Sequence, residues 1–143
     1  MNDDHLARIV RLFETFAPAD VARLGEFYRD DAAFKDPFNE VRGVAAVQRV
    51  FAHMFETLDD PRFVITQQVR GGNDCWLAWE FEFRFRSMQR GKMQLVRGAS
   101  HLVLAGDGRI QSHRDYWDAA EEVYEKLPVV GAVLRWLKRR AAA

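Results

Sequence analysis

The sequence has little cysteine, no excess of either charge and no long apolar run. Its single cysteine, Cys75, excludes an internal disulfide framework and a cysteine-rich zinc site. Basic and acidic residues number 21 each, whereas a general nucleic-acid binder would carry a basic excess. No apolar stretch approaches the roughly 20 residues of a membrane span, and the acidic N-terminus begins a helical pattern rather than a secretion signal. We therefore expect a cytoplasmic protein that binds no nucleic acid.

Apolar and aromatic side chains are plentiful in this chain. Of its 143 residues, 48% are hydrophobic and 13% aromatic, including 11 Phe and 4 Trp. This length corresponds to about one domain. So many flat apolar rings indicate a lined cavity as well as a core.

The first 60 residues have helical periodicity. Apolar residues recur at helical spacing from Leu6 to Phe16, Pro18 can open a short second helix, and Gly43 precedes a third helix with an apolar stripe. In this prediction Tyr28 lies on the apolar side of the second helix. A short apolar strand at 32–34 separates the second and third helices.

From Pro61 onward the period changes to two, which is typical of strands. We expect strands at 62–69, 75–86, 92–106 and 109–118, joined by turns rich in glycine. The second of them is the clearest, because one face carries only apolar residues: Leu77, Trp79, Phe81, Phe83 and Phe85. Helices followed by such a meander predict an α+β fold, with a curved antiparallel sheet wrapped around three N-terminal helices and enclosing a conical hollow.

The C-terminal region predicts an extra helix after Pro128. We divide the chain into a cone domain, 1–128, and an amphipathic basic helix, 129–143. Its stripe consists of Val129, Val130, Val133, Leu134 and Leu137. The helix is expected to pack over the mouth of the cone or on a partner subunit, and the alternative is contact with an anionic membrane surface. The preceding acidic segment, 118–127, predicts a helical turn or two.

Two segments carry a resemblance to a known family. Residues 28–43, YRDDAAFKDPFNEVRG, and 106–118, GDGRIQSHRDYWD, resemble the nuclear transport factor 2-like superfamily in its SnoaL-like and ketosteroid-isomerase-like branch. The resemblance spans residues 5–118 and implies a cone-shaped domain that binds a small hydrophobic molecule. It also implies isomerase, cyclase or dehydratase chemistry that uses carboxylates and needs no metal and no organic cofactor.

The resemblance and the strand alternation together select the candidate site. Asp36 resembles the general base of the isomerases, and Asp115 the cavity aspartate of the cyclases. Alternation places Asp115 on one face with His113, the proposed proton partner. The candidate ligand-binding residues are Tyr28, Phe51, Met54, Trp79, Phe83, Phe85, Ser100 and Trp117. On the penultimate strand Gly98 and Ser100 point inward, or Arg97 and Ala99 if the register slips by one residue.

Structural explanations exist for the same residues. Asp36, before a proline, can cap a turn, and Asp115 and His113 can bond to each other or to the backbone. The aromatic face can be core rather than pocket. The domain is then a non-catalytic binding or scaffold module. On the opposite side of the sheet, four apolar residues suggest a homodimer through the sheet: Trp76, Met93, Leu95 and Val103.

Overall fold

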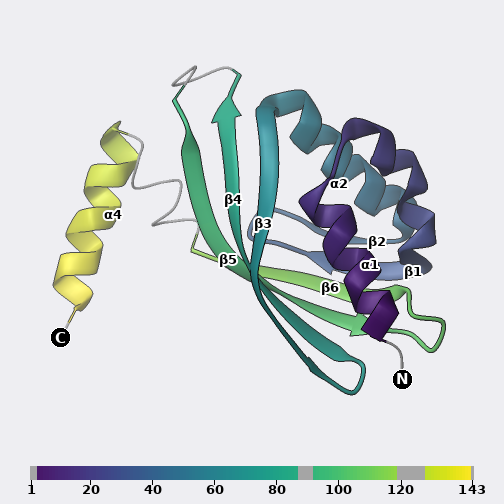
Figure 1. Ribbon diagram of the computed structural model, residues 1–143. Coiled ribbons are helices and arrows are strands. Elements are labelled where there is room, and N and C mark those ends of the chain that lie inside the picture. Colours follow the sequence, from purple (N-terminus) through teal and green to yellow (C-terminus); the bar gives the residue numbers. More distant parts are fainter. Residues whose placement is uncertain (1–2, 87–91, 119–127, 143) are drawn as a thin grey trace.

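A six-stranded sheet forms the body of the protein, in the order β2-β1-β6-β5-β4-β3. The computed structural model describes residues 3–86, 92–118 and 128–142. The long strands are β3 (Leu58–Gly71), β4 (Asp74–Phe85), β5 (Gln94–Leu104) and β6 (Ile110–Trp117). Each pairs antiparallel with the next, so the predicted meander is confirmed. Figure 1 shows this sheet curving around the N-terminal helices, which confirms the α+β cone.

The N-terminal helices are α1 (Asp3–Glu14), the 3₁₀ helix η1 (Pro18–Glu26) and α2 (Val44–Thr57). Pro18 begins η1, and the Asp20 carboxylate accepts a hydrogen bond from the Ala17 backbone N–H at 2.9 Å, which caps the first turn. Gly43 precedes α2 with φ at 96°, a conformation that favours glycine. All three predicted helices are present.

The edge of the sheet differs from the prediction. β1 (Tyr28–Lys35) is longer than the expected strand and begins at Tyr28, which the sequence analysis wrongly assigned to the second helix. β1 pairs parallel with β6, where Phe34 lies opposite His113, and antiparallel with the short β2 (Glu40–Arg42), which was not predicted. The parallel pairing brings the beginning of the cone next to its last strand.

The core lies between the concave face of the sheet and α1, η1 and α2. On β4, Leu77, Trp79 and Phe83 are buried, whereas Trp76 is 43% exposed on the other face. On β5, Ser100 is buried and Arg97 is exposed, so the register that points Gly98 and Ser100 inward is the observed one. The long alternating strands therefore place their aromatic face inside, as predicted.

The predicted C-terminal helix is present as α4 (Pro128–Ala141). Figure 1 shows it to one side of the cone, with Val133, Trp136 and Leu137 about half exposed. Most of the expected acidic helical turn, 119–127, lies outside the described residues. Within the part of the chain that the structure describes, no helix is long and apolar enough to cross a membrane.

Candidate functional site

Two cavities lie between the concave face of the sheet and the helices. The outer cavity has a volume of about 270 Å³, and the inner cavity, deeper in the cone, has about 20 Å³. Trp79, Phe51, Phe63 and Asp115 line both. Half of the residues that line the outer cavity are aromatic, from β1, the turn after it, α2, β3, β4 and β6: Phe34, Phe38, Phe51, Phe63, Trp79, Phe81, Phe83, Phe85 and Trp117. Such a space suits a small hydrophobic molecule.

A continuous hydrogen-bonded chain of side chains lies at the boundary of the two cavities. The Trp79 indole N–H donates to Ser100 Oγ at 2.8 Å, and the Ser100 hydroxyl donates to Asp115 Oδ1 at 2.5 Å. His113 Nε2 lies 2.6 Å from the same carboxylate oxygen, and His113 Nδ1 lies 2.6 Å from the Tyr28 hydroxyl. The chain therefore links β4, β5, β6 and β1 through one carboxylate.

The geometry assigns a direction to each of these bonds. An ionised Asp115 only accepts, so His113 Nε2 carries a proton and donates it; with a neutral imidazole, Nδ1 then accepts from the Tyr28 hydroxyl. Complete burial, and next the charge of Asp115, raise the pKa of Tyr28 well above its ordinary value, so this hydroxyl keeps its proton. The donors in this chain are therefore all directed toward Asp115, which accepts at its end.

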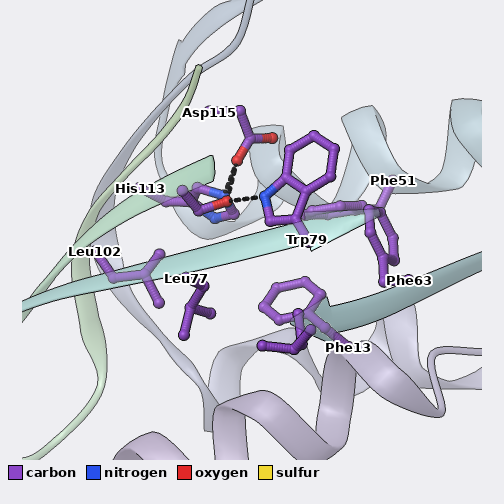
Figure 2. A pocket seen from close by; sticks show the side chains of 10 residues that line it. Phe13, Phe51, Phe63, Leu77, Trp79, Leu102, His113 and Asp115 are labelled. Carbon is purple, nitrogen blue, oxygen red and sulfur yellow. Dashed lines mark hydrogen bonds and ion pairs between the residues drawn. The ribbon is translucent and has the colours of Figure 1, made fainter. Parts of the chain in front are cut away.

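The second oxygen of Asp115 is available to a ligand. Among the described residues none donates a hydrogen bond to Oδ2, although Oδ1 accepts two. The Asp115 side chain is 18% exposed and lines the outer cavity. In Figure 2 the second oxygen points away from the hydrogen-bonded one. A carboxylate held by two donors, with a free oxygen in an apolar space, is placed to accept a proton or a hydrogen bond.

Asp36 lines the same outer cavity but is tied into its own turn. Its Oδ1 accepts from the backbone N–H of Phe38 at 2.8 Å and of Asn39 at 2.7 Å, and the Asn39 side-chain amide reaches Oδ1 at 3.1 Å and Oδ2 at 3.2 Å. This is the turn-capping arrangement that the sequence analysis kept open. The two aspartates therefore share a cavity and differ in how their oxygens are engaged.

The other predicted residues fall into three groups. Phe51, Met54, Trp79, Phe83, Phe85 and Trp117 line the outer cavity, and Ser100 lines the inner one. Tyr28 lines neither, because it lies fully buried behind His113. Phe63 was not among the predicted residues, although it stacks on Phe81 with ring centroids 4.3 Å apart and lines both cavities. Its alternation with Ile65 along β3 was the available signal.

Metal-ligating side chains do not gather at this site. Within the described residues, no three of the His, Cys, Asp and Glu side chains come together as they would around a metal ion. His113 and Asp115 are bonded to each other and to neutral hydroxyl groups. The groups present at the site offer proton transfer and hydrogen bonding.

Several solved structures share the fold. A protein with a ketosteroid isomerase-like fold from Catenulispora acidiphila, solved in complex with trimethylamine, is 17% identical with a TM-score of 0.73, covering 90% of this chain and 96% of that one. TsrD from Streptomyces laurentii is 14% identical with a TM-score of 0.73 over 92% and 98%. A candidate SnoaL-like polyketide cyclase from Shewanella putrefaciens is 17% identical with a TM-score of 0.69 over 86% and 97%. At these identities the likeness establishes the fold.

Sequence comparison identifies the family. No curated protein matches the chain. The family model of the SnoaL-like domain matches residues 9–113, which is most of the cone and includes His113 but ends two residues before Asp115. The chain therefore belongs to the family of SnoaL-like domains.

Proposed function

We propose that this protein binds a small hydrophobic molecule in the outer cavity and acts on it by acid–base chemistry, with Asp115 as the proton acceptor. The observation that supports this most directly is the asymmetric engagement of the Asp115 carboxylate. Oδ1 accepts from Ser100 and His113, while Oδ2 has no donor among the described residues and Asp115 borders an aromatic-walled cavity of about 270 Å³. Such a group is held in one orientation with one reactive oxygen.

The chemistry that fits this geometry is proton abstraction from a carbon next to a carbonyl. The C–H bond breaks, its proton moves to Asp115 Oδ2, and the electron pair moves into an enolate. Return of the proton to a different carbon gives isomerisation. Attack of the enolate on a second carbonyl gives cyclisation, in which the new alkoxide takes the proton from Asp115. Loss of a β-hydroxyl group, which leaves as water with that proton, gives dehydration. His113 and Ser100 hold the carboxylate by hydrogen bonds before transfer. Tyr28 holds the imidazole in the tautomer whose protonated nitrogen, Nε2, faces Asp115.

A non-catalytic ligand-binding or scaffold module is the second candidate, and the state of Asp36 favours it. The turn satisfies both oxygens of Asp36, so of the two aspartates that line the outer cavity Asp115 alone has an oxygen without a donor among the described residues. Moving a proton between two sites generally benefits from a second acid–base group. In that case the carboxylate only accepts a hydrogen bond from the ligand.

A hydrogen-exchange experiment separates the two candidates. Acetylnaphthalene, a neutral ketone, is incubated with the protein in deuterium oxide, and loss of its methyl proton signal is followed by NMR. We expect exchange with the native protein and with Asp31→Asn, an exposed control, and at least about 100-fold slower exchange with Asp115→Asn. Asparagine preserves the shape of the side chain and an acceptor for Ser100 and His113, so the fold should be retained.

The outcomes of this experiment are distinct. If calorimetry shows that the ketone binds but no variant accelerates exchange, the binding-module function is supported. If Asp115→Asn exchanges as fast as the native protein, Asp115 is not the base. If the ketone does not bind at all, the proposal of an apolar ligand site is contradicted.

We also propose that two copies associate through the convex face of the sheet. On this face Trp76, Leu95 and Tyr116 are 43%, 38% and 42% exposed, and Met93 beside β5 is 46% exposed. Trp76 stacks on His101 with centroids 4.6 Å apart and approaches Tyr116 at 5.7 Å. Large, exposed apolar side chains that adjoin one another on a sheet face favour association with a complementary surface, and a second copy supplies one.

A further inference from the structure

The indole of Trp79 lies between the two cavities. Trp79 lines both, whereas Leu77 and Leu102 line only the inner cavity and Phe83 lines only the outer one. The side chain is buried, with 6% of the residue exposed. A ligand in the outer cavity therefore meets this ring. Figure 2 shows the indole between Asp115 and Phe63.

Three contacts hold the indole in place. Its N–H donates to Ser100 Oγ at 2.8 Å. Its ring meets the ring of Phe63 edge-on, with centroids 6.1 Å apart and an interplanar angle of 89°. Its outer edge lies against the backbone of Gly98, which is directly opposite Trp79 in the β4–β5 pairing. A ring with an anchor on each side cannot swing aside without breaking one of them.

The contact between the indole and residue 98 requires glycine, because every other residue type has a β-carbon. A β-carbon at this position would lie 2.5 Å from Cη2 and 2.7 Å from Cζ2 of Trp79, and 2.9 Å from Cβ of Trp117, which faces Gly98 from β6. These distances are too short for carbon atoms in contact. Glycine within a strand often marks a place where another group must approach the backbone closely, and here the group is the indole.

We infer that Trp79 determines how deep a ligand can extend into the cone, and that Gly98 is the positioning residue that lets the indole occupy this place. This role rests on the proposed apolar ligand site and defines which ligand lengths that site accepts. Ligands that end at the indole are accepted, and ligands that need the inner cavity are rejected. Truncating the indole should open space between the two cavities, whose shared lining is Trp79, Phe51, Phe63 and Asp115.

A homologous series of methyl ketones, with alkyl chains from propyl to decyl, measures this depth by isothermal titration calorimetry. For the native protein, affinity should rise about fourfold for each added methylene and then stop rising at a break length, where the chain reaches the indole. In Trp79→Leu the break should move to a longer chain. Trp79→Phe is a milder variant that loses the second ring and the N–H, and its break should move in the same direction.

Gly98→Ala tests the positioning role. The added methyl group must displace the indole toward the ligand, so affinity should fall at least about tenfold across the whole series. Combining Gly98→Ala with Trp79→Leu should restore much of the affinity and the long break length of Trp79→Leu alone, because the ring is gone and only the 2.9 Å approach to Cβ of Trp117 remains. A purely structural defect at Gly98 would not be rescued in this way. Trp76→Leu, on the same strand but on the convex face, is the matched control and should leave the break unchanged.

Each result decides a separate point. An identical break in the native protein, Trp79→Leu and Trp79→Phe overturns the role of Trp79. Native-like binding by Gly98→Ala, or an unrescued loss in the double variant, overturns the role of Gly98. If no ketone binds the native protein, the proposed ligand site itself fails and the inference falls with it, which differs from binding without a shift in the break.

Discussion

The ring of Tyr28 lies parallel to the imidazole of His113, at an interplanar angle of 10° with centroids 5.9 Å apart, and its hydroxyl is 2.6 Å from His113 Nδ1. The two residues are neighbours because β1 and β6 pair in parallel. This contact settles which imidazole nitrogen faces Asp115. Tyr28 therefore acts on the carboxylate through His113, without reaching either cavity.

Tyr28→Phe should destabilise the protein and disturb the site. The variant keeps the ring but leaves His113 Nδ1 buried without a donor, which should cost about 1–3 kcal/mol of unfolding free energy. Chemical denaturation measures this loss. Tyr116→Phe, which changes a tyrosine that is 42% exposed on the convex face, is the control and should lose less than about 0.5 kcal/mol. Equal losses in the two variants would contradict the buried bond.

Alkaline pH should weaken the native fold through the same hydroxyl. The native pKa of Tyr28 is raised well above the ordinary value of 10.0, so above pH 10 the unfolded chain releases this proton and the folded protein keeps it. The contribution of Tyr28 to the free energy of unfolding is therefore fully present below about pH 10. It is lost as pH rises toward the native pKa, by up to about 1.4 kcal/mol per pH unit. Denaturation of the native protein and Tyr28→Phe across this range isolates the effect. Parallel curves for the two proteins would contradict it.

Two substitutions at Asp36 should separate the effect of its negative charge from the effect of the hydrogen bonds by which it caps its turn. Asp36→Asn keeps an oxygen that accepts from the backbone of Phe38 and Asn39, so stability should change by less than about 0.5 kcal/mol. Asp36→Ala removes the acceptor and should lose about 1 kcal/mol. If proton exchange of the bound ketone slows in both variants alike, Asp36 takes part in the chemistry by its charge. If exchange is unaffected in Asp36→Asn, the residue serves the turn alone.

A single charge on the convex face should prevent self-association. The native protein should sediment as a dimer, and Trp76→Glu as a monomer, because the substitution places a carboxylate where apolar surface would be buried. Ala45→Glu, on an exposed position of α2, is the matched control and should remain dimeric. A native protein that sediments as a monomer at every concentration tested would rule out the association.

The long alternating strands could be predicted because each carries its own local signal. Residues 79–85 of β4 alternate strictly between aromatic and charged side chains, which was enough to place Trp79 and Phe83 inside. The three residues of β2 are too few to show a period. Tyr28 continues the helical spacing of η1 equally well, and its place in β1 is determined by pairing with β6, a distant part of the chain that leaves no local pattern.

Many residues of the candidate site could be predicted, although Phe63 was missed, but the hydrogen bonds between them could not. Asp115 and His113 share a face of β6 by simple alternation. The bond between Trp79 and Ser100 depends on the register in which Ser100 pairs with Leu77, two residues away from Trp79. The division of the hollow into two cavities depends on where the indole lies against Gly98, which follows from packing in three dimensions.

The parallel pairing of β1 with β6 has a consequence for synthesis on the ribosome. The hydrogen bond between Tyr28 and His113 joins residues 85 positions apart. The first strand is translated long before its central partner, and until that partner leaves the exit tunnel it has only the three-residue β2 beside it. Closure of such a distant pairing is slow, so the carboxylate site should be among the last parts of the nascent chain to form.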